Sequence, residues 1–140
     1  METEYRKMTI DDYGRVRRLW ESDPGIGLSG ADSEENIRRF LDANDGTNFV
    51  ATSGDRIAGS VLCGSDGRRG YLYHLIVAED SRRHGIGGRL IQLCLQGLSA
   101  RGIDKCHLFV FETNELAIEY YRNADWNERD DLKIFSKKTG

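Results

Sequence analysis

The sequence predicts an α/β protein in which helices pack on a mixed β-sheet. Apolar runs typical of buried strands occupy residues 71–77 and 105–111. Between them, residues 85–101 repeat their apolar positions with the period of a helix. Strand and helix patterns that alternate along a chain are typical of a sheet covered by helices. At 140 residues the chain is long enough to bury a core, and we expect one domain over residues 1–140.

The first half of the chain is predicted to form a strand, two helices and a hairpin. A strand at Glu4–Met8 precedes Thr9 and Asp12, which suit a capping box that opens the first helix. Residues 23–32 ("DPGIGLSGAD") are typical of a loop, and residues 47–64 of a hairpin around Gly54-Asp55. Each helix has apolar positions on one face, which are Tyr13, Val16, Leu19 and Trp20 in the first and Ile37, Phe40 and Leu41 in the second.

The second half is predicted to alternate strands and helices. A strand at Tyr71–Val77 leads to a helix over Gly85–Arg101, which Gly102 ends. The remaining predicted elements are a strand at Lys105–Phe111, a helix at Asn114–Asn123 and a last strand at Leu132–Lys138.

Composition narrows the class of protein. A net charge of −3 and a pI of about 5.6 argue against nucleic-acid binding through bulk electrostatics. No apolar run approaches the roughly 20 residues that cross a bilayer, and the first residues ("METEYRK") lack a signal-peptide core. Cys63, Cys94 and Cys106 show no metal or disulfide spacing, so we expect a cytoplasmic protein without a metal, whose cysteines serve packing.

Residues 25–30 match the dinucleotide pattern GxGxxG, but their context does not fit it. That fingerprint needs a strand before it and a helix directly after it. Here the pattern follows the end of a helix and lies inside a long loop. We interpret it as a loop that is free to line a pocket.

Residues 82–90 ("RRHGIGGRL") have the context that the first motif lacks, because they join a strand to the start of a helix. N–H groups in a first helical turn bind anions, and glycines let a ligand approach them closely. The arginines at 82, 83 and 89 add positive charge. No Gly-Lys-Ser/Thr follows, which excludes a Walker loop. The stretch therefore predicts a pyrophosphate site, with a solvated basic helix start as the alternative.

Arg82–Gly87 fits R/Q-x-x-G-x-G, and the chain here resembles the GNAT superfamily of N-acetyltransferases. Residues 114–121 resemble the family's N-x-x-A-x-x-x-Y segment, and Asp125-Trp126 stands where Gly-Phe is usual. The element order is also similar over about residues 4–137. The resemblance implies the acyl-CoA N-acyltransferase fold, a single three-layer domain that uses acetyl-CoA as cosubstrate.

The resemblance also implies where acetyl-CoA binds. In this fold the fourth and fifth strands splay apart and the cofactor lies between them. The backbone of Leu75 and Val77 is expected to pair with the pantetheine arm, and the N–H groups of residues 83–88 to hold the pyrophosphate. The complete expected cofactor set is Leu75, Ile76, Val77, Arg82, Arg83, His84, Gly85, Ile86, Gly87, Gly88 and Asn114.

Acetyl transfer to an amine needs one proton removed from an ammonium of pKa about 10 and one supplied to the leaving thiolate. By its motif position, Tyr121 is expected to be the general acid, with a core aromatic as the alternative, while Tyr120 is interpreted as packing.

The sequence offers no obvious residue for the role of general base. The positions where relatives carry a carboxylate or imidazole hold Tyr71, Tyr73 and Phe109. Strand alternation predicts that the His74 side chain lies on the opposite face of the strand from residues 71, 73 and 75, and that it has a structural role. We therefore expect a water relay ordered by Tyr73 or a backbone carbonyl, with Glu112 as the reserve candidate.

The predicted function is transfer of acetyl from acetyl-CoA to a primary amine of a small molecule or peptide. The alternatives are a non-catalytic acyl-CoA-binding sensor and an interaction subunit. Acidic residues near the acceptor side, Asp23, Asp32 and Glu35, either attract a cationic amine or simply solvate the surface. We expect no nucleic-acid or membrane partner, and a homodimer is possible.

Overall fold

The structure is a computed structural model that describes residues 2–140. The chain divides after Phe109 into two compact units. The first unit holds all five strands, β1 (Thr3–Lys7), β2 (Phe49–Ser53), β3 (Arg56–Ser65), β4 (Gly70–Val77) and β5 (Cys106–Leu108). Its α-helices are α1 (Tyr13–Glu21), α2 (Glu34–Ala43) and α3 (Ile86–Ala100), and its short 3-10 turns are η1 (Ile10–Asp12), η2 (Gly30–Asp32) and η3 (Glu79–Ser81). The second unit contains α4 (Glu115–Asn123).

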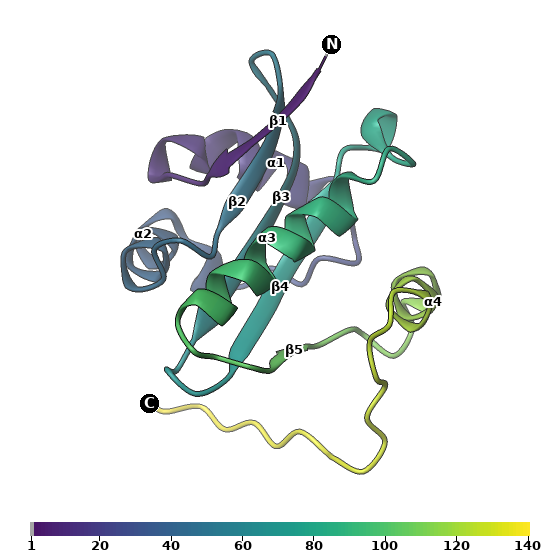
Figure 1. The fold of residues 1–140 in the computed structure, drawn as a ribbon. Helices are drawn as coiled ribbons and strands as arrows, with labels where there is room; N and C mark the ends of the chain where they lie inside the picture. Colours follow the sequence, from purple (N-terminus) through teal and green to yellow (C-terminus); the bar gives the residue numbers. More distant parts are fainter. Residues whose placement is uncertain (1) are drawn as a thin grey trace. The chain divides into compact units, whose positions relative to one another are not determined.

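The first unit has three layers (Figure 1). The strands lie in sequence order, β1 to β4 antiparallel and β5 parallel to β4. A Cβ at Gly59 would approach Ile86 and Leu90 of α3, whereas a Cβ at Gly64 would meet Phe40 of α2. Helix α3 therefore covers one face of the sheet and α1 and α2 cover the other. This arrangement confirms the predicted fold class.

The face under α1 and α2 carries a continuous apolar core. Val16 and Trp20 of α1 are fully buried, and Ile37 of α2 packs with them. Ile76 of β4 belongs to the same cluster, so β4 presents this residue to the α1/α2 face. The apolar faces predicted for both helices are thereby confirmed. Among residues 2–140, no helix is long and apolar enough to cross a membrane.

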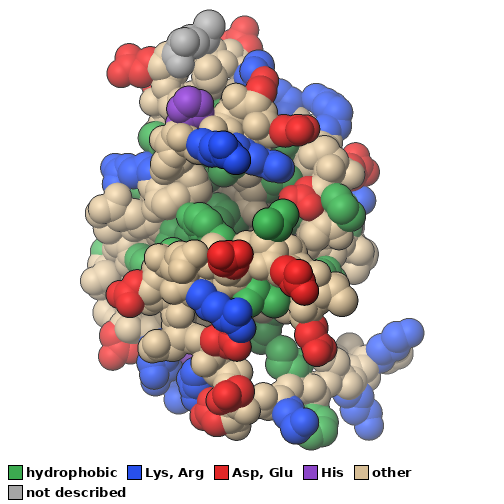
Figure 2. Space-filling view, turned by 90° about the vertical axis from the view of Figure 1, so that its right-hand side faces the viewer, with side chains coloured by type: hydrophobic (Ala, Val, Ile, Leu, Met, Phe, Trp, Pro, Cys, Tyr) green, Lys and Arg blue, Asp and Glu red, His purple; other side chains and the backbone are tan. Residues whose placement is uncertain are grey.

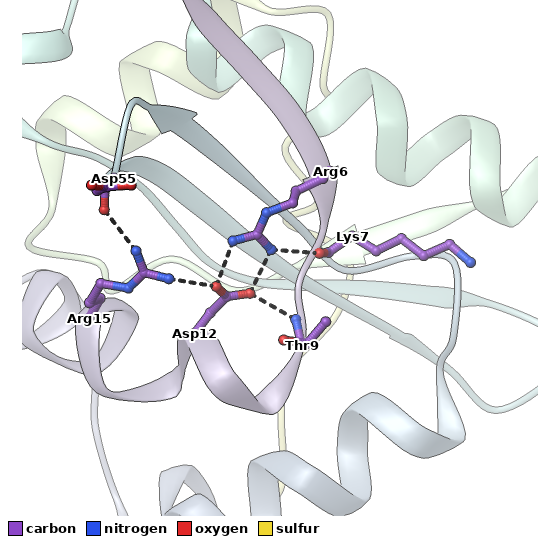
Figure 3. A network of polar contacts seen from close by, with 6 residues as sticks. All are labelled: Arg6, Lys7, Thr9, Asp12, Arg15 and Asp55. Carbon is purple, nitrogen blue, oxygen red and sulfur yellow. Dashed lines mark hydrogen bonds and ion pairs between the residues drawn. The ribbon is translucent and has the colours of Figure 1, made fainter.

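Asp12 joins the first strand, the first helix and the β2–β3 turn (Figure 3). Its buried carboxylate accepts two hydrogen bonds from Arg6, at 2.7 and 2.8 Å, and one from Arg15 at 3.0 Å. It also accepts the N–H of Thr9 at 2.9 Å, as a capping-box residue does. Arg15 in turn donates to the carbonyl of Asp55 at 2.7 Å. The carboxylate thus fixes where α1 starts relative to the sheet edge.

This network predicts an acid-sensitive part of the stability. Desolvation raises the pKa of Asp12, but the hydrogen bonds from Arg6 and Thr9 and the nearby positive charges outweigh it, so the pKa is lowered. A lowered pKa stabilises the fold above the unfolded value of about 3.9, and this stabilisation is lost as pH falls through the folded value. Asp12→Asn should therefore destabilise the protein by about 2 kcal/mol at pH 7 and by less at pH 3.

Urea unfolding of both proteins at the two pH values measures this difference. Asp45→Asn is the control, because Asp45 pairs with Lys7 at 3.4 Å in an exposed position and should change stability little. If the free energy of unfolding of wild type and Asp12→Asn differs by the same amount at both pH values, the lowered pKa assigned to Asp12 is contradicted.

Two predicted strands differ from the structure. The strand predicted over Lys105–Phe111 is shorter, since β5 covers Cys106–Leu108. The strand predicted for Leu132–Lys138 is wrong, because residues 132–138 form no β-ladder. A strand exists through backbone hydrogen bonds to a neighbouring strand. Apolar alternation along a segment does not supply that neighbour.

The second unit keeps the predicted helix and its ends. The side chain of Asn114 caps α4 by accepting the N–H of Ala117 at 3.2 Å. After the helix, Asp125 has a φ of 68°, and the N–H of Trp126 donates to the carbonyl of Tyr121 at 3.1 Å. This is the hydrogen-bonding pattern of a helix that ends through a left-handed residue. Asp replaces the usual glycine there because a short polar side chain tolerates that backbone conformation.

Candidate active site

Strand β4 has an open edge beyond its pairing with β5. The two strands pair at residues 70–72 of β4, and β4 continues to Val77. The N–H of Ala78 donates a hydrogen bond to the carbonyl of Ala58 in β3 at 2.8 Å. Because successive residues of a strand direct their backbone groups to alternate sides, Leu75 and Val77 face the edge away from β3. The carbonyl of Val77 already accepts a hydrogen bond from Nε of Arg82 at 3.2 Å.

A bulge interrupts β4 at His74. Tyr73 pairs with Leu62 and Ile76 pairs with Ser60, so the two residues between them stand opposite one residue of β3. His74 has a φ of 50°. Its ring packs 4.9 Å from that of Trp20 in α1, on the same face as Tyr73, whose ring lies 6.3 Å from Phe40 of α2.

The prediction that His74 lies on the opposite face from Tyr73 was therefore wrong. Alternation of faces assumes regular pairing, and the extra residue of the bulge shifts the alternation by one.

Asp32 also differs from its predicted environment. The sequence suggested an acidic residue that solvates the surface or attracts an amine, but Asp32 is buried at the end of η2. Its Oδ1 lies 2.8 Å from Nε2 of His74. The preceding residues 23–29 form a loop, as predicted, and its Ile26 and Leu28 pack against the core. The loop thereby brings a carboxylate under β4.

Helix α3 begins without a side-chain cap. Its N-cap is Gly85, with a φ of 75°, and the first helical hydrogen bond runs from the N–H of Arg89 to the carbonyl of Gly85 at 3.1 Å. Within residues 2–140, the N–H groups of residues 86–88 make no hydrogen bond. A Cβ added at Gly85 or Gly88 would meet no atom within 4 Å. The helix start is therefore open to an anion.

The charge around this helix start is positive. Arg82, Arg83 and His84 are exposed, and the first turn of α3 carries no acidic residue. Figure 2 shows basic side chains gathered beside a histidine in the upper part of the face that it presents. Arg83 has a φ of 68°, so two left-handed residues, Arg83 and Gly85, shape the turn. Such turns direct successive N–H groups toward one point.

The chain matches the family model described as "Acetyltransferase (GNAT) family" over residues 14–126. It belongs to the GNAT family of acetyltransferases. It is 36% identical over 131 residues to an acetyltransferase of Pectobacterium atrosepticum, which covers 94% of this chain and 92% of that relative.

Two solved structures share the GNAT fold with this chain. A predicted acetyltransferase of Clostridium acetobutylicum, solved with acetyl-CoA, has a TM-score of 0.75 at 20% identity and covers 96% of both chains. An aminoglycoside acetyltransferase from an uncultured soil metagenomic sample has a TM-score of 0.74 at 19% identity and covers 99% of this chain and 97% of that one.

Family membership confirms the enzyme class that the sequence predicted, an acetyl-CoA-dependent N-acetyltransferase. Within this GNAT chain the first unit brings together most of the expected cofactor residues. The end of β4 leads through η3 directly into Arg82 and the start of α3. The remaining cofactor residue, Asn114, belongs to the second unit, as does Tyr121, the expected general acid. There the Tyr121 ring lies 5.2 Å from Tyr120 and 5.7 Å from Trp126.

The phenol of Tyr73 and the thiols of Cys63 and Cys106 in this GNAT acetyltransferase stay protonated near neutral pH. Desolvation and neighbouring groups raise the pKa of Tyr73, which keeps its hydroxyl as a donor. For Cys63, an interaction with Cys106 lowers the pKa, but Cys94 and burial raise it to about 12. Interaction with Cys63 and burial likewise raise the pKa of Cys106. Protonated thiols are poor nucleophiles, which favours the packing role predicted for these cysteines.

Proposed function

We propose that this protein transfers the acetyl group of acetyl-CoA to a primary amine of a small molecule or peptide by direct attack. The observation that carries the proposal is the open edge of β4, which continues into the uncapped start of α3. An extended backbone edge suits an amide-containing arm, and an uncapped helix start suits a diphosphate. Pantetheine and pyrophosphate are joined in this order in coenzyme A.

Each part of the cofactor has residues that suit it. The backbone of Leu75 and Val77 pairs with the amides of the arm like an added strand. The N–H groups of residues 83–88 hold the pyrophosphate, and Arg82, Arg83 and His84 add charge. Ile76 and Ile86 are buried side chains that fix these two backbone segments. Asn114 is assigned to the arm through its place at the start of α4.

Tyr121 is the proposed general acid for the leaving sulfur. A thiol of pKa about 8.5 leaves most easily when its sulfur is protonated, and a phenol is a competent donor. Tyr73 is exposed to 37% of its surface on the α1/α2 face, beside His74. Its hydroxyl orders the water or amine that reaches this face.

The acceptor is a primary amine of a small molecule or of a peptide. The related fold of the soil-derived aminoglycoside acetyltransferase supports an amine acceptor. The α1/α2 face of β4 supplies the acceptor side, because it carries Tyr73 and the buried acid Asp32.

A thiol-release assay tests the proposal. Wild type is mixed with acetyl-CoA and, in separate reactions, alkylamines, amino acids, polyamines, aminoglycosides and peptides with an unblocked N-terminus. We expect thiol release with at least one class, together with a product heavier by one acetyl group in the mass spectrum. Acetyl-CoA binding without turnover on any amine would favour the acyl-CoA sensor instead.

A further inference from the structure

His74 and Asp32 form a shielded pair on the α1/α2 face of the sheet. We propose that this pair is the general base of the reaction: His74 accepts a proton from the acceptor ammonium, and Asp32 positions its ring. The inference rests on the proposed function, because it requires an amine acceptor. It supplies a proton acceptor that positions 71, 73 and 109 do not offer, since tyrosine, tyrosine and phenylalanine stand there.

The pair is held rigidly by its surroundings. The side chains of His74 and Asp32 are exposed to 15% and 10%, so water does not compete for their 2.8 Å contact. The second carboxylate oxygen of Asp32 accepts the N–H of Ser29 at 3.0 Å. The backbone carbonyl of Asp32 accepts the hydroxyl of Tyr13 at 2.6 Å and the guanidinium of Arg17 at 3.2 Å. A carboxylate fixed in this way binds the N–H form of Nε2 and leaves the lone pair on Nδ1.

The nitrogen that would take the proton is accessible. Within residues 2–140, Nδ1 of His74 makes no hydrogen bond. The buried polar side-chain atoms of these residues that lack a hydrogen-bond partner are Trp20 Nε1 and Ser60 Oγ, so Nδ1 of His74 is not a buried atom. Nδ1 is thus neither engaged by the protein nor sealed from solvent. The T-shaped contact with Trp20, at 4.9 Å, holds the ring plane. An amine or a bridging water therefore has one defined nitrogen to approach.

In the chain, His74 stands immediately before the proposed cofactor edge. His74 occupies the left-handed conformation of the β4 bulge, which is uncommon for a residue with a side chain. The next residue, Leu75, directs its backbone groups to the open edge. The bulge therefore turns the imidazole to the acceptor face at the residue before the cofactor contact begins.

The charged and titratable groups that face the pair come from three elements. Asp32 lies at the end of η2, Tyr13 and Arg17 of α1 contact it, and His74 itself belongs to β4, where Tyr73 precedes it in the chain. Arg17 also pairs with Glu21 of its own helix at 3.3 Å. The carboxylate of Asp32 is the group in direct contact with the imidazole, and it stabilises the imidazolium that proton transfer creates.

The bonds and protons of the step balance. His74 takes one proton from the ammonium, and the neutral nitrogen then bonds to the thioester carbonyl carbon as the carbon–sulfur bond breaks. The second nitrogen proton ends on sulfur by way of the Tyr121 hydroxyl. The imidazolium returns its proton to water. The products are an amide, the coenzyme A thiol and one proton.

The test is the pH dependence of kcat/KM for wild type, His74→Gln and Asp32→Asn, with the best amine from the thiol-release panel. Wild-type kcat/KM should rise through one ionisation and reach a plateau. His74→Gln, which keeps an amide donor for Asp32, should lose about 100-fold at pH 7 and lose that ionisation. Asp32→Asn should lower kcat/KM by no more than His74→Gln does, because Asp32 acts through the ring, which is then no longer held in one tautomer.

A second acceptor separates catalysis from structure. An analogue of the amine with a trifluoromethyl group on the carbon that bears the nitrogen is mostly neutral at pH 7 and needs no deprotonation before attack. With it, His74→Gln should be within a few fold of wild type, which a folding defect would not allow. His107→Gln is the control histidine variant and should keep the wild-type profile, and the acetyl-CoA Kd should be the same for all variants.

The outcomes separate this inference from the function on which it rests. Turnover by wild type with an unchanged profile in His74→Gln would overturn the base assignment and leave the acetyltransferase intact. Equal losses by His74→Gln with both acceptors would also overturn it, in favour of a structural role. Wild type that turns over no amine would overturn the proposed function, and the base with it.

Discussion

Gly88→Glu should abolish tight binding of acetyl-CoA while leaving the protein at least as stable as wild type. The change puts a carboxylate over the start of α3, where no atom lies within 4 Å of a Cβ at this position. Glutamate is a better helix former than glycine by about 0.5–1 kcal/mol, and a negative charge in the first turn is favourable. The same charge repels a pyrophosphate, and we expect the Kd to rise by about 100-fold or more.

Isothermal titration with acetyl-CoA and a thermal melt measure both effects. Gly88→Gln is the matched control, because it has the same length without the charge and should weaken binding far less. Wild-type affinity in Gly88→Glu would show that the pyrophosphate does not lie at this helix start.

Tyr121→Phe should lower kcat by about 100- to 1,000-fold with little change in the acetyl-CoA Kd. The substitution removes the hydroxyl that we assign to protonation of the leaving sulfur. A positioned general acid typically contributes a rate factor of about this size. The phenyl ring keeps the packing against Tyr120 and Trp126, at 5.2 and 5.7 Å, so α4 should remain folded. A loss in kcat without a loss in binding identifies an interaction made in the transition state.

Steady-state thiol release with the best amine gives both constants. Tyr120→Phe is the control, since the sequence interprets Tyr120 as packing, and its kcat should stay within a few fold of wild type. If Tyr121→Phe keeps the wild-type kcat, the hydroxyl has no catalytic role and Tyr121 is a packing residue.

Most of the fold was predictable because its signals are local. The helix predicted over residues 85–101 forms at Ile86–Ala100, because its apolar stripe, its glycine start and Gly102 at its end lie in one continuous segment. The same holds for the hairpin around Gly54. The last predicted strand failed because pairing depends on a neighbour that the segment itself does not encode.

The pair of His74 and Asp32 was not predictable from local pattern. These residues are 42 positions apart in the sequence and meet only after the loop before α2 folds under β4. The bulge that turns His74 is set by the register between β3 and β4, so alternation within β4 placed it on the wrong face. A histidine inside an apolar strand, followed by the glycine motif, was the only signal available.

The proposed cofactor site is tested most directly by an amide correlation NMR spectrum of the ¹⁵N-labelled protein as coenzyme A is added. We predict that the largest shifts occur at the amides of Leu75 and Val77 and of residues 83–88. Shifts confined to residues 23–32, or no shifts at all, would contradict a cofactor site at the β4 edge and the start of α3.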